Sequence, residues 1–345
     1  MAGRKYRVGV LGATGAVGTN ILEQLADRGF PAAEVVPFAS ERSSGKPVGF
    51  GDTLLECRVP SAESIQGIEI LISSAGGSVS AEWAPQFVEA GAVVIDNTSF
   101  WRMHDDVPLV VAGVNPEAAE HHRGIIANPN CTTMVMMMAL APIHRAAGLE
   151  RLILSSYQAV SGTGQRAIEE LRDQSAAVLA DEQVPAPEAY PHQIAFNVLP
   201  QVESFKDGDD YTTEERKVMA ETRKILGIGD QVGISATCAR VPVISGHSES
   251  LNIQTTTDLS PDDCRALLDA SEGIVVSDSP AEGIYPMAID AAGIDDVLVG
   301  RIRRDPGHER CLNLWLVGDN LRKGAATNAV QVAELLVEQD WLNPA

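Results

Sequence analysis

The chain has 345 residues, which is longer than most single domains, so two domains are expected. Hydrophobic residues make up 45% of it, enough for a real core, and this argues against disorder. The formal net charge of −21 argues against nucleic acid or an anionic membrane as a partner, so local Arg and Lys side chains must bind any anionic ligand.

The first part of the chain predicts βαβ units. Residues 1–8 lead directly into a strand and contain no apolar segment of the kind found in secretory signals. Strands are expected at residues 7–11, 35–40, 68–74 and 92–96, with one helix after the first strand and another at residues 81–90. This alternation predicts a parallel sheet, and the nearly continuous apolar runs are typical of strands covered on both faces.

A glycine-rich turn follows the first strand and opens a helix, with Gly12, Gly15 and Gly18 three residues apart. Such a turn allows the pyrophosphate of a dinucleotide to approach the backbone at the helix N-terminus. The spacing differs from GxGxxG, and taken alone it fits a plain tight turn equally well.

The segment after the second strand discriminates between the two nicotinamide cofactors. Ser40, Arg42 and Ser43 offer two hydroxyls and a cation to a 2′-phosphate, which favours NADP over NAD. The alternative is a solvated polar loop, and the NADP interpretation requires that Glu41 point to solvent.

Cys131 lies in the segment NPNCTT (residues 128–133), directly before an apolar run that predicts a helix reaching Gly148. A helix N-terminus favours the thiolate, although most single cysteines are small buried hydrophobic residues. The chain has five cysteines and no CxxC pair, so we expect neither a disulfide framework nor a metal site, and a reducing cytoplasm fits best. The longest apolar run, residues 134–143, is too short to span a bilayer.

From about residue 152 the pattern changes to alternating apolar and polar residues. Strands are expected at residues 152–160, 233–238 and 251–256, which predicts an antiparallel sheet with one exposed face. Residues 325–339 predict an amphipathic helix with four apolar residues on one face, namely Ala329, Val332, Ala333 and Leu336.

Thiol catalysis at a carbonyl needs a base, an oxyanion donor and substrate anchors. Gln158 ends a strand just before a second glycine turn that contains Ser161 and Gly162. Arg240 and His247 flank an irregular segment with a proline and a glycine, which could aim both side chains into one cleft. Most histidines are structural or solvated, but His247 lies among turn residues close to an arginine.

Taken together, these motifs resemble the aspartate-semialdehyde dehydrogenase family of bacterial type. The matching segments are residues 12–18, 74–78, 96–99 with Arg102, 128–133, 157–162, Arg240 with His247, and 318–325. They run in family order over nearly the full length. The chain departs from many relatives at residues 112–115, where AGVN replaces PEVN, with no catalytic consequence.

The resemblance implies an α/β fold with a Rossmann-type parallel-sheet NADP domain at residues 1–130, completed by a C-terminal helix at 320–345. It implies an α+β catalytic and dimerisation domain with a mixed or antiparallel sheet at residues 131–319. The implied reaction is NADPH-dependent reductive dephosphorylation of L-4-aspartyl phosphate to L-aspartate 4-semialdehyde, on the way to lysine, methionine, threonine and isoleucine. A cytoplasmic homodimer or tetramer is expected.

The resemblance also implies a role for each matching residue. Cys131 would attack the acyl carbon, and His247 would act as general acid/base. Gln158 would orient the thioacyl intermediate and Asn130 would polarise its carbonyl. The substrate contacts would be Arg240 with the α-carboxylate, Glu214 with the ammonium, and Arg102 and Lys217 with the phosphate. The cofactor contacts would be Gly12, Thr14, Gly15, Ala16, Val17, Ser40, Arg42, Ser43, Ser74, Gly76, Ser161, Gly162 and Asn320.

The residues alone leave some of these roles open. Glu214 and Lys217 would otherwise be an ordinary surface pair three residues apart, on a helix for which Thr212 and Glu215 predict a capping box. Arg102 would likewise pass as a solvated loop residue.

Two other functions remain possible for the chain. One is an N-acetyl-γ-glutamyl-phosphate reductase, whose cysteine context is normally NPGCY, so Asn130 and Thr132 argue against it. The other is a non-catalytic homologue serving as a binding or scaffold subunit. Such a protein would have lost the nucleophile, whereas this chain retains the full catalytic set.

Overall fold

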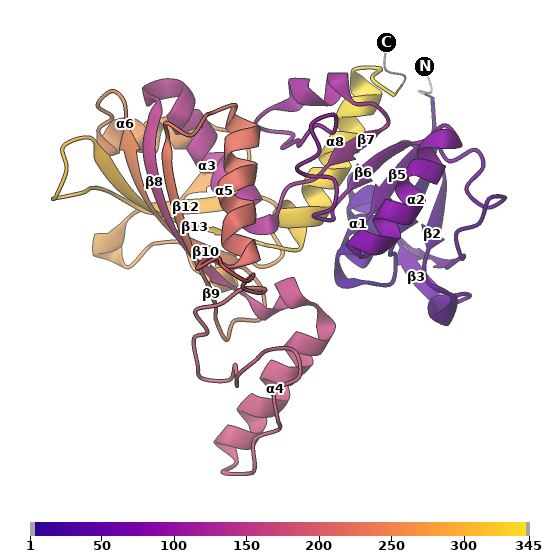
Figure 1. Cartoon of the computed structure of the whole chain (residues 1–345), viewed down its shortest axis with the longest axis horizontal. Coiled ribbons are helices and arrows are strands. Elements are labelled where there is room, and N and C mark those ends of the chain that lie inside the picture. The colour runs from indigo at the N-terminus through magenta and orange to yellow at the C-terminus, as the bar shows by residue number, and fades with distance from the viewer. Residues whose placement is uncertain (1–3, 343–345) are drawn as a thin grey trace. The chain divides into compact units, whose positions relative to one another are not determined.

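In the computed structural model, residues 4–342 are described, and they form two compact units (Figure 1). The first unit combines the chain up to residue 130 with the residues from 325 onward, and the second contains residues 131–324. The sequence predicts the return to the first unit at residue 320, whereas residues 320–324 group with the second unit. Residues 1–3 and 343–345, at the outer ends of the predicted first domain, lie outside the described residues.

The first unit is built on a five-stranded sheet in the order β2-β1-β5-β6-β7. Its strands are β1 (Tyr6–Leu11), β2 (Ala32–Phe38), β5 (Ile70–Ser73), β6 (Val93–Asp96) and β7 (Ile125–Ala127). Every neighbouring pair is parallel, so the predicted parallel sheet is confirmed. The other elements are α1 (Ala16–Asp27), η1 (Glu41–Ser43), β3 (Pro47–Phe50), β4 (Thr53–Glu56), α2 (Gly77–Glu89), η2 (Pro116–His121) and α8 (Asn328–Glu338).

Helix α8 completes the core of the first unit, although it comes from the far end of the chain. Its apolar face is fully buried, including Ala329, Ala333 and Leu336, and it packs in one cluster with strand residues such as Ile72. The predicted amphipathic helix is therefore confirmed. It begins later than expected, because η5 (Arg322–Thr327) forms a π-helical turn before it.

The second unit contains a six-stranded sheet in the order β11-β12-β13-β10-β8-β9. Its strands are β8 (Leu149–Gln158), β9 (Gly233–Arg240), β10 (His247–Thr255), β11 (Ile274–Val276), β12 (Val297–Arg304) and β13 (Cys311–Gly318). Its helices are α3 (Cys131–Ala147), η3 (Val160–Thr163), α4 (Gln165–Leu179), α5 (Thr213–Leu226), α6 (Pro261–Asp269), η4 (Pro280–Glu282) and α7 (Ala288–Ala291).

This sheet is mixed, which confirms the expected mixed or antiparallel sheet. Of these two alternatives, the antiparallel sheet suggested by the alternating pattern is wrong. β10 pairs antiparallel with β8 and β13, but β8 pairs parallel with β9, as β11 does with β12. The connection from β8 to β9 runs through α4 and α5, which is long enough for the crossover that a parallel pair requires. In Figure 1, α5 lies against the sheet while α4 extends away from it.

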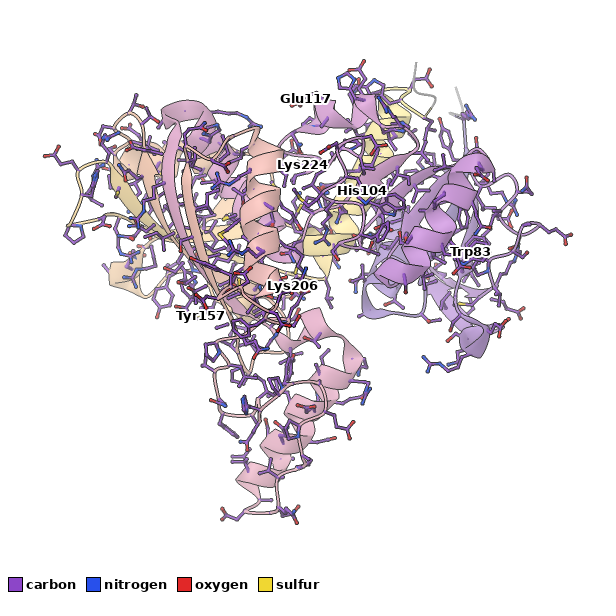
Figure 2. All side chains as sticks on the ribbon, in the orientation of Figure 1. Trp83, His104, Glu117, Tyr157, Lys206 and Lys224 are labelled. Carbon is purple, nitrogen blue, oxygen red and sulfur yellow. The ribbon has the colours of Figure 1, made fainter. Side chains whose placement is uncertain are left out.

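The register of the sheet determines which side chains share a face. Helix α3 begins at Cys131, as predicted, and contacts β8, β10 and β13, while α5 contacts β9. Side chains of the opposite face include Tyr157, labelled in Figure 2, whose ring lies 5.4 Å from that of Trp315. Among residues 4–342, no helix combines the length and the apolar character needed to cross a membrane.

Candidate active site

The end of the second unit's sheet brings three predicted site residues together. Gln158 pairs with Arg240 across β8 and β9, and both are the last residues of their strands. His247 is the first residue of β10, which runs antiparallel to β8, so it begins where β8 ends. Because side chains alternate along a strand, the register gives all three the same face, the one covered by α3 and α5.

Cys131 differs from the other four cysteines of the chain in its exposure. It is partly exposed at the first residue of α3, whereas Cys57, Cys238, Cys264 and Cys311 are buried. Burial raises the pKa of Cys264 to about 12 and also raises that of Cys238, so these thiols stay protonated. Exposure and a helix N-terminus therefore favour thiolate chemistry at Cys131 alone.

The backbone packs closely against this cysteine. A Cβ added to Gly324 would lie 2.9 Å from the Cβ of Cys131, which is too close for any side chain. The segment after β13 therefore needs a glycine here, and it defines one wall beside the thiol.

His247 lies next to Cys131, with 3.3 Å between its Nε2 and the cysteine Sγ. The backbone N–H of Ala159 donates to Nδ1 at 3.1 Å, so Nδ1 acts as the acceptor. In the neutral ring the proton must then be on Nε2, directed at the sulfur. The ring is fully buried, and burial together with Arg240 lowers the pKa of His247 to about 3. His247 is therefore neutral near pH 7 and donates its Nε2 proton.

Arg240 contacts the same residue, Ala159, through its carbonyl group. Its Nη1 donates to the carbonyl oxygen of Ala159 at 2.7 Å, and its guanidinium lies 5.8 Å from the ring centre of Tyr190. A Cβ at Gly162 would approach both Arg240 Nη1 (3.2 Å) and His247 Cε1 (3.3 Å). The backbone of Ala159 thus contacts both Arg240 and His247, and the sequence contains no signal for this link.

Gln158 begins a chain of polar contacts that leads to α5. Its Nε2 donates to Ser156 Oγ at 3.3 Å and to Glu214 Oε1 at 3.0 Å. The other oxygen of Glu214 lies 2.9 Å from Lys217 Nζ. Glu214 is only 3% exposed, so it does not form an ordinary surface pair with Lys217. The capping box predicted for Thr212 and Glu215 is confirmed.

Lys217 has a second acidic partner that the sequence analysis missed. Its Nζ lies 2.5 Å from Oε1 of Glu203, which belongs to the loop before α5. Burial alone would lower the pKa of Lys217, but the Glu214 and Glu203 carboxylates outweigh it and hold the pKa above its ordinary value. Glu203 lies outside any helix or strand, so no periodicity in the sequence connects it to Lys217.

Glu249 is a second acidic residue that the sequence analysis missed. It is two residues after His247 on β10 and pairs with Ser156, so it projects from the same face. It is fully buried, and within residues 4–342 neither carboxyl oxygen has a hydrogen-bond partner. Burial raises its pKa well above the ordinary value, which favours the neutral form of the acid. Because side chains alternate between the two faces of a strand, the position of Glu249 two residues after His247 could have identified it from the sequence.

Replacing Glu249 with Gln should stabilise the protein at neutral pH. The folded-state pKa of Glu249 is raised, so unfolding releases a proton above the unfolded-state pKa, and wild-type stability falls as pH rises from there. The advantage of Glu249→Gln should be small near pH 4 and grow by up to about 1.4 kcal/mol per pH unit toward pH 7. Urea unfolding at several pH values measures it, with the exposed Glu188→Gln as control. A pH-independent difference would show that Glu249 is ionised in the folded protein.

Arg102 and Asn130 belong to the first unit. Arg102 is only 7% exposed, and it donates to the carbonyl oxygens of Asn97 at 2.7 Å and Asn128 at 2.9 Å, so it is not a solvated loop residue. Asn128 is bonded to Asn97 and to Asn328 of α8. This network orders the segment that ends at the buried Asn130, the chain neighbour of Cys131.

The glycine turn of the first unit packs closely against neighbouring backbone atoms, so it has no room for side chains at two of its glycines. Gly12 has φ +87°, and a Cβ there would lie 2.8 Å from the backbone nitrogen of Ala75. A Cβ at Gly18 would lie 2.1 Å from the carbonyl oxygen of Gly12. The predicted contacts Thr14, Gly15, Ala16 and Val17 run from this turn into α1, while Ser74 and Gly76 follow β5. All lie after the carboxyl ends of neighbouring parallel strands, where dinucleotides bind in such sheets.

The residues predicted to contact a 2′-phosphate lie at η1. Ser40 and Arg42 are exposed, and Glu41 is exposed as the NADP interpretation requires. Ser43 is only 7% exposed, so Ser40 and Arg42 are the more accessible pair.

Ser161, Gly162 and Asn320 belong to the second unit. Asn320 is 3% exposed; its amide donates to Ser161 Oγ at 2.9 Å, and its carbonyl accepts from the backbone of Gly246 at 3.1 Å. Both polar side chains are thus bonded within the unit. Through Gly246 they support the turn that leads into His247.

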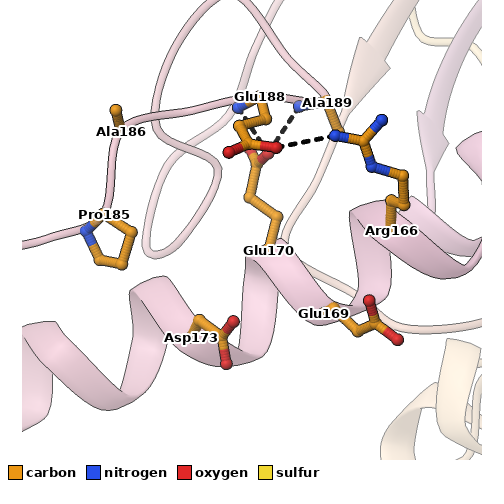
Figure 3. A pocket seen from close by; sticks show the side chains of 8 residues that line it. All are labelled: Arg166, Glu169, Glu170, Asp173, Pro185, Ala186, Glu188 and Ala189. Atoms are coloured by element: carbon orange, nitrogen blue, oxygen red, sulfur yellow. Dashed lines mark hydrogen bonds and ion pairs between the residues drawn. The ribbon is translucent and has the colours of Figure 1, made fainter.

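A pocket in the arm formed by α4 contains none of the predicted site residues (Figure 3). Its lining consists of Arg166, Glu169, Glu170, Asp173, Pro185, Ala186, Glu188 and Ala189. Glu170 accepts hydrogen bonds from the backbone of Glu188 and Ala189, and Arg166 pairs with the Glu188 carboxylate. These contacts hold the loop against α4, which is a structural role.

Comparison with known proteins connects this geometry to a family. Residues 7–122 match the family model described as "Semialdehyde dehydrogenase, NAD binding domain", and residues 140–323 match "Semialdehyde dehydrogenase, dimerisation domain". The chain is 50% identical to an aspartate-semialdehyde dehydrogenase of Aquifex aeolicus over 337 residues, covering 97% of this chain and 98% of the relative.

Two solved structures are also similar. Aspartate semialdehyde dehydrogenase II from Vibrio cholerae, complexed with ASA, has a TM-score of 0.93 at 44% identity and covers 97% of this chain and 99% of that one. The enzyme with NADP from Candida albicans has a TM-score of 0.74 at 25% identity and covers 98% and 100%.

Proposed function

The chain belongs to the aspartate-semialdehyde dehydrogenase family, and from this premise we propose that it reduces L-4-aspartyl phosphate to L-aspartate 4-semialdehyde with NADPH and releases phosphate. The observation that carries the proposal is the pair formed by Cys131 and His247 at 3.3 Å, beside Gln158 and Arg240. A thiol at a helix N-terminus next to a hydrogen-bond donor suits acyl transfer.

In the first step, the Cys131 thiolate forms a C–S bond to the acyl carbon, and the bond from that carbon to the phosphate oxygen breaks. His247 acts as a donor, because the Ala159 N–H keeps the ring proton on Nε2. The proton faces Sγ, where it stabilises the thiolate and then the oxygen that becomes negative at the attacked carbonyl. Asn130, the chain neighbour of the nucleophile, is proposed as a second donor to that oxygen.

The thioester is then reduced and released as aldehyde, which restores the Cys131 thiolate. The bound cofactor supplies the hydride. The glycine turn fits a dinucleotide, because Gly12 allows the sharp turn and Gly18 allows α1 to pack closely on it, and a Cβ at either position would clash with backbone atoms. Gln158 is proposed to orient the acyl group, since its amide is held by Ser156 and Glu214.

The substrate has a carboxylate, an ammonium and a phosphate to be bound. Arg240 suits the carboxylate: its Nε is buried and has no hydrogen-bond partner among the described residues, and this donor needs an acceptor. Glu214 suits the ammonium. Lys217 and Arg102 suit the phosphate, as cations in a chain that is strongly acidic overall.

Assembly as a homodimer or tetramer and a cytoplasmic location stay predictions. The match of residues 140–323 to a dimerisation-domain model supports the former.

The direct test is the reverse reaction, in which aspartate semialdehyde reduces NADP only when inorganic phosphate is present. NAD as the cofactor and N-acetylglutamate semialdehyde as the substrate serve as controls. Faster turnover of the N-acetylglutamate compound would contradict the proposed substrate, and turnover independent of phosphate would contradict the phosphorylating reaction.

Replacing Arg42 with Ala should raise the Michaelis constant for NADP by about tenfold, and that for NAD much less, because only NADP presents a 2′-phosphate to the exposed guanidinium. Steady-state kinetics with each cofactor measures both constants. Equal changes for the two cofactors would exclude Arg42 from the 2′-phosphate site.

A further inference from the structure

The ammonium of Lys217 lies between two carboxylates. Its Nζ is 2.5 Å from Glu203 Oε1 and 2.9 Å from Glu214 Oε2. One positive charge facing two negative charges leaves this cluster with a net charge of −1. A phosphate dianion approaching Lys217 therefore meets a locally negative group in a chain whose net charge is already −21.

The two carboxylates differ in how firmly they are held. The side chain of Glu214 is 3% exposed, and its other oxygen accepts a hydrogen bond from Gln158. Glu214 therefore cannot move away from Lys217 without losing this hydrogen bond to Gln158. The side chain of Glu203 is 44% exposed, and its remaining oxygen accepts from Thr213 Oγ1 at 2.6 Å. Glu203 can therefore move into solvent, where water replaces its partners.

The backbone at Glu203 is also strained. Its φ is +62°, a left-handed backbone conformation that residues other than glycine rarely adopt. Its own carbonyl accepts from Gln201 Nε2 at 2.9 Å. Such a conformation persists only where surrounding contacts maintain it, and the pair with Lys217 is one of these contacts.

We propose that Glu203 is a displaceable counter-ion of Lys217, whose carboxylate takes the position on the ammonium that the substrate phosphate takes during turnover. The proposal rests on the proposed function of Lys217 in binding phosphate. Displacement favours the anion with the larger charge, because a dianion attracts the ammonium more strongly than the single charge of Glu203 does. Glu203 thus selects phosphate over monoanions such as carboxylates, and it sets the affinity for phosphate.

The test measures the Michaelis constant for inorganic phosphate in the reverse reaction at saturating semialdehyde and NADP. Glu203→Gln keeps the shape of the side chain and an acceptor for Thr213 but removes the charge. We expect the constant to fall about threefold or more, with inhibition by acetate becoming stronger and the constant for semialdehyde unchanged. The difference should shrink as KCl is added. Glu188→Gln, which removes one charge from the α4 arm, should leave the constant for phosphate unchanged.

A second experiment distinguishes competition between Glu203 and phosphate for Lys217 from a role of Glu203 in anchoring the loop. Lys217→Ala should raise the Michaelis constant for phosphate, and adding Glu203→Gln to that variant should change nothing more. Isothermal titration of the purified proteins with inorganic phosphate gives the same comparison without turnover. A constant that rises or stays equal in Glu203→Gln, or a gain that persists without Lys217, would overturn the proposal. Wild-type turnover that needs no phosphate would instead overturn the proposed function itself.

Discussion

Cys131→Ser is expected to lower turnover by about a thousandfold or more while leaving the affinity for NADP nearly unchanged. The thiolate is accessible at a helix N-terminus and accepts a hydrogen bond from His247 Nε2, whereas a serine hydroxyl is far too weakly acidic to ionise in the same position. Both the acyl transfer and the release of the aldehyde need a sulfur that is a good nucleophile and a good leaving group.

The experiment compares turnover with cofactor binding in the same preparations. Cofactor fluorescence measures NADPH affinity, and the phosphate-dependent assay measures turnover. Cys311→Ala at the buried start of β13 controls for a general effect of removing a thiol, and it should retain activity. Activity of Cys131→Ser within a few-fold of wild type would remove Cys131 from the role of nucleophile.

Arg240→Lys is expected to reduce kcat/KM for the semialdehyde by about a hundredfold or more, although the charge is kept. A lysine cannot present the two parallel donors that fit a carboxylate, so the acyl carbon would be misplaced relative to Cys131. The structure adds a second reason. Arg240 donates to the Ala159 carbonyl, and the N–H of the same residue orients His247, so the substitution loosens the histidine as well.

Kinetics that vary semialdehyde and phosphate independently distinguish an effect on carboxylate binding from an effect on phosphate binding. Arg240→Lys should act mainly through the semialdehyde, whereas Lys217→Ala should act mainly through phosphate. Arg240→Ala, unlike Arg240→Lys, removes the charge that acts together with burial to lower the pKa of His247 to about 3, so in Arg240→Ala the pH profile should show a higher pKa for His247. Wild-type kinetics for Arg240→Lys would show that this residue does not bind the α-carboxylate.

Local sequence patterns were sufficient to predict those structural features that depend on residues close together in the chain. The apolar runs predicted a parallel sheet in the first unit, and the 3.6-residue period predicted the buried face of α8. The turn residues before Cys131 predicted a helix beginning there, and the capping box at Thr212 followed from residues three apart. Each of these features arises from backbone geometry that repeats within a few residues.

The alternation of apolar and polar residues did not distinguish parallel from antiparallel pairing in the second unit. The same period of two occurs in both, because it reflects only which face is buried. The direction of each strand depends on the connections between strands, such as the passage through α4 and α5 between β8 and β9.

Length, charge pattern, the helix start at Cys131 and the order of motifs were determined by the sequence alone, since each needs only the identity and spacing of nearby residues. The tertiary structure decided which distant groups meet. Cys131 and His247 are 116 positions apart, and Ala159 is 88 positions from the ring whose tautomer it sets. Spacing predicts neither the contact of Glu203 with Lys217 nor the raised pKa of Glu249. Hydrogen bonds and pKa values depend on distance and burial in space, and these exist only after the strands have paired and the helices have covered them.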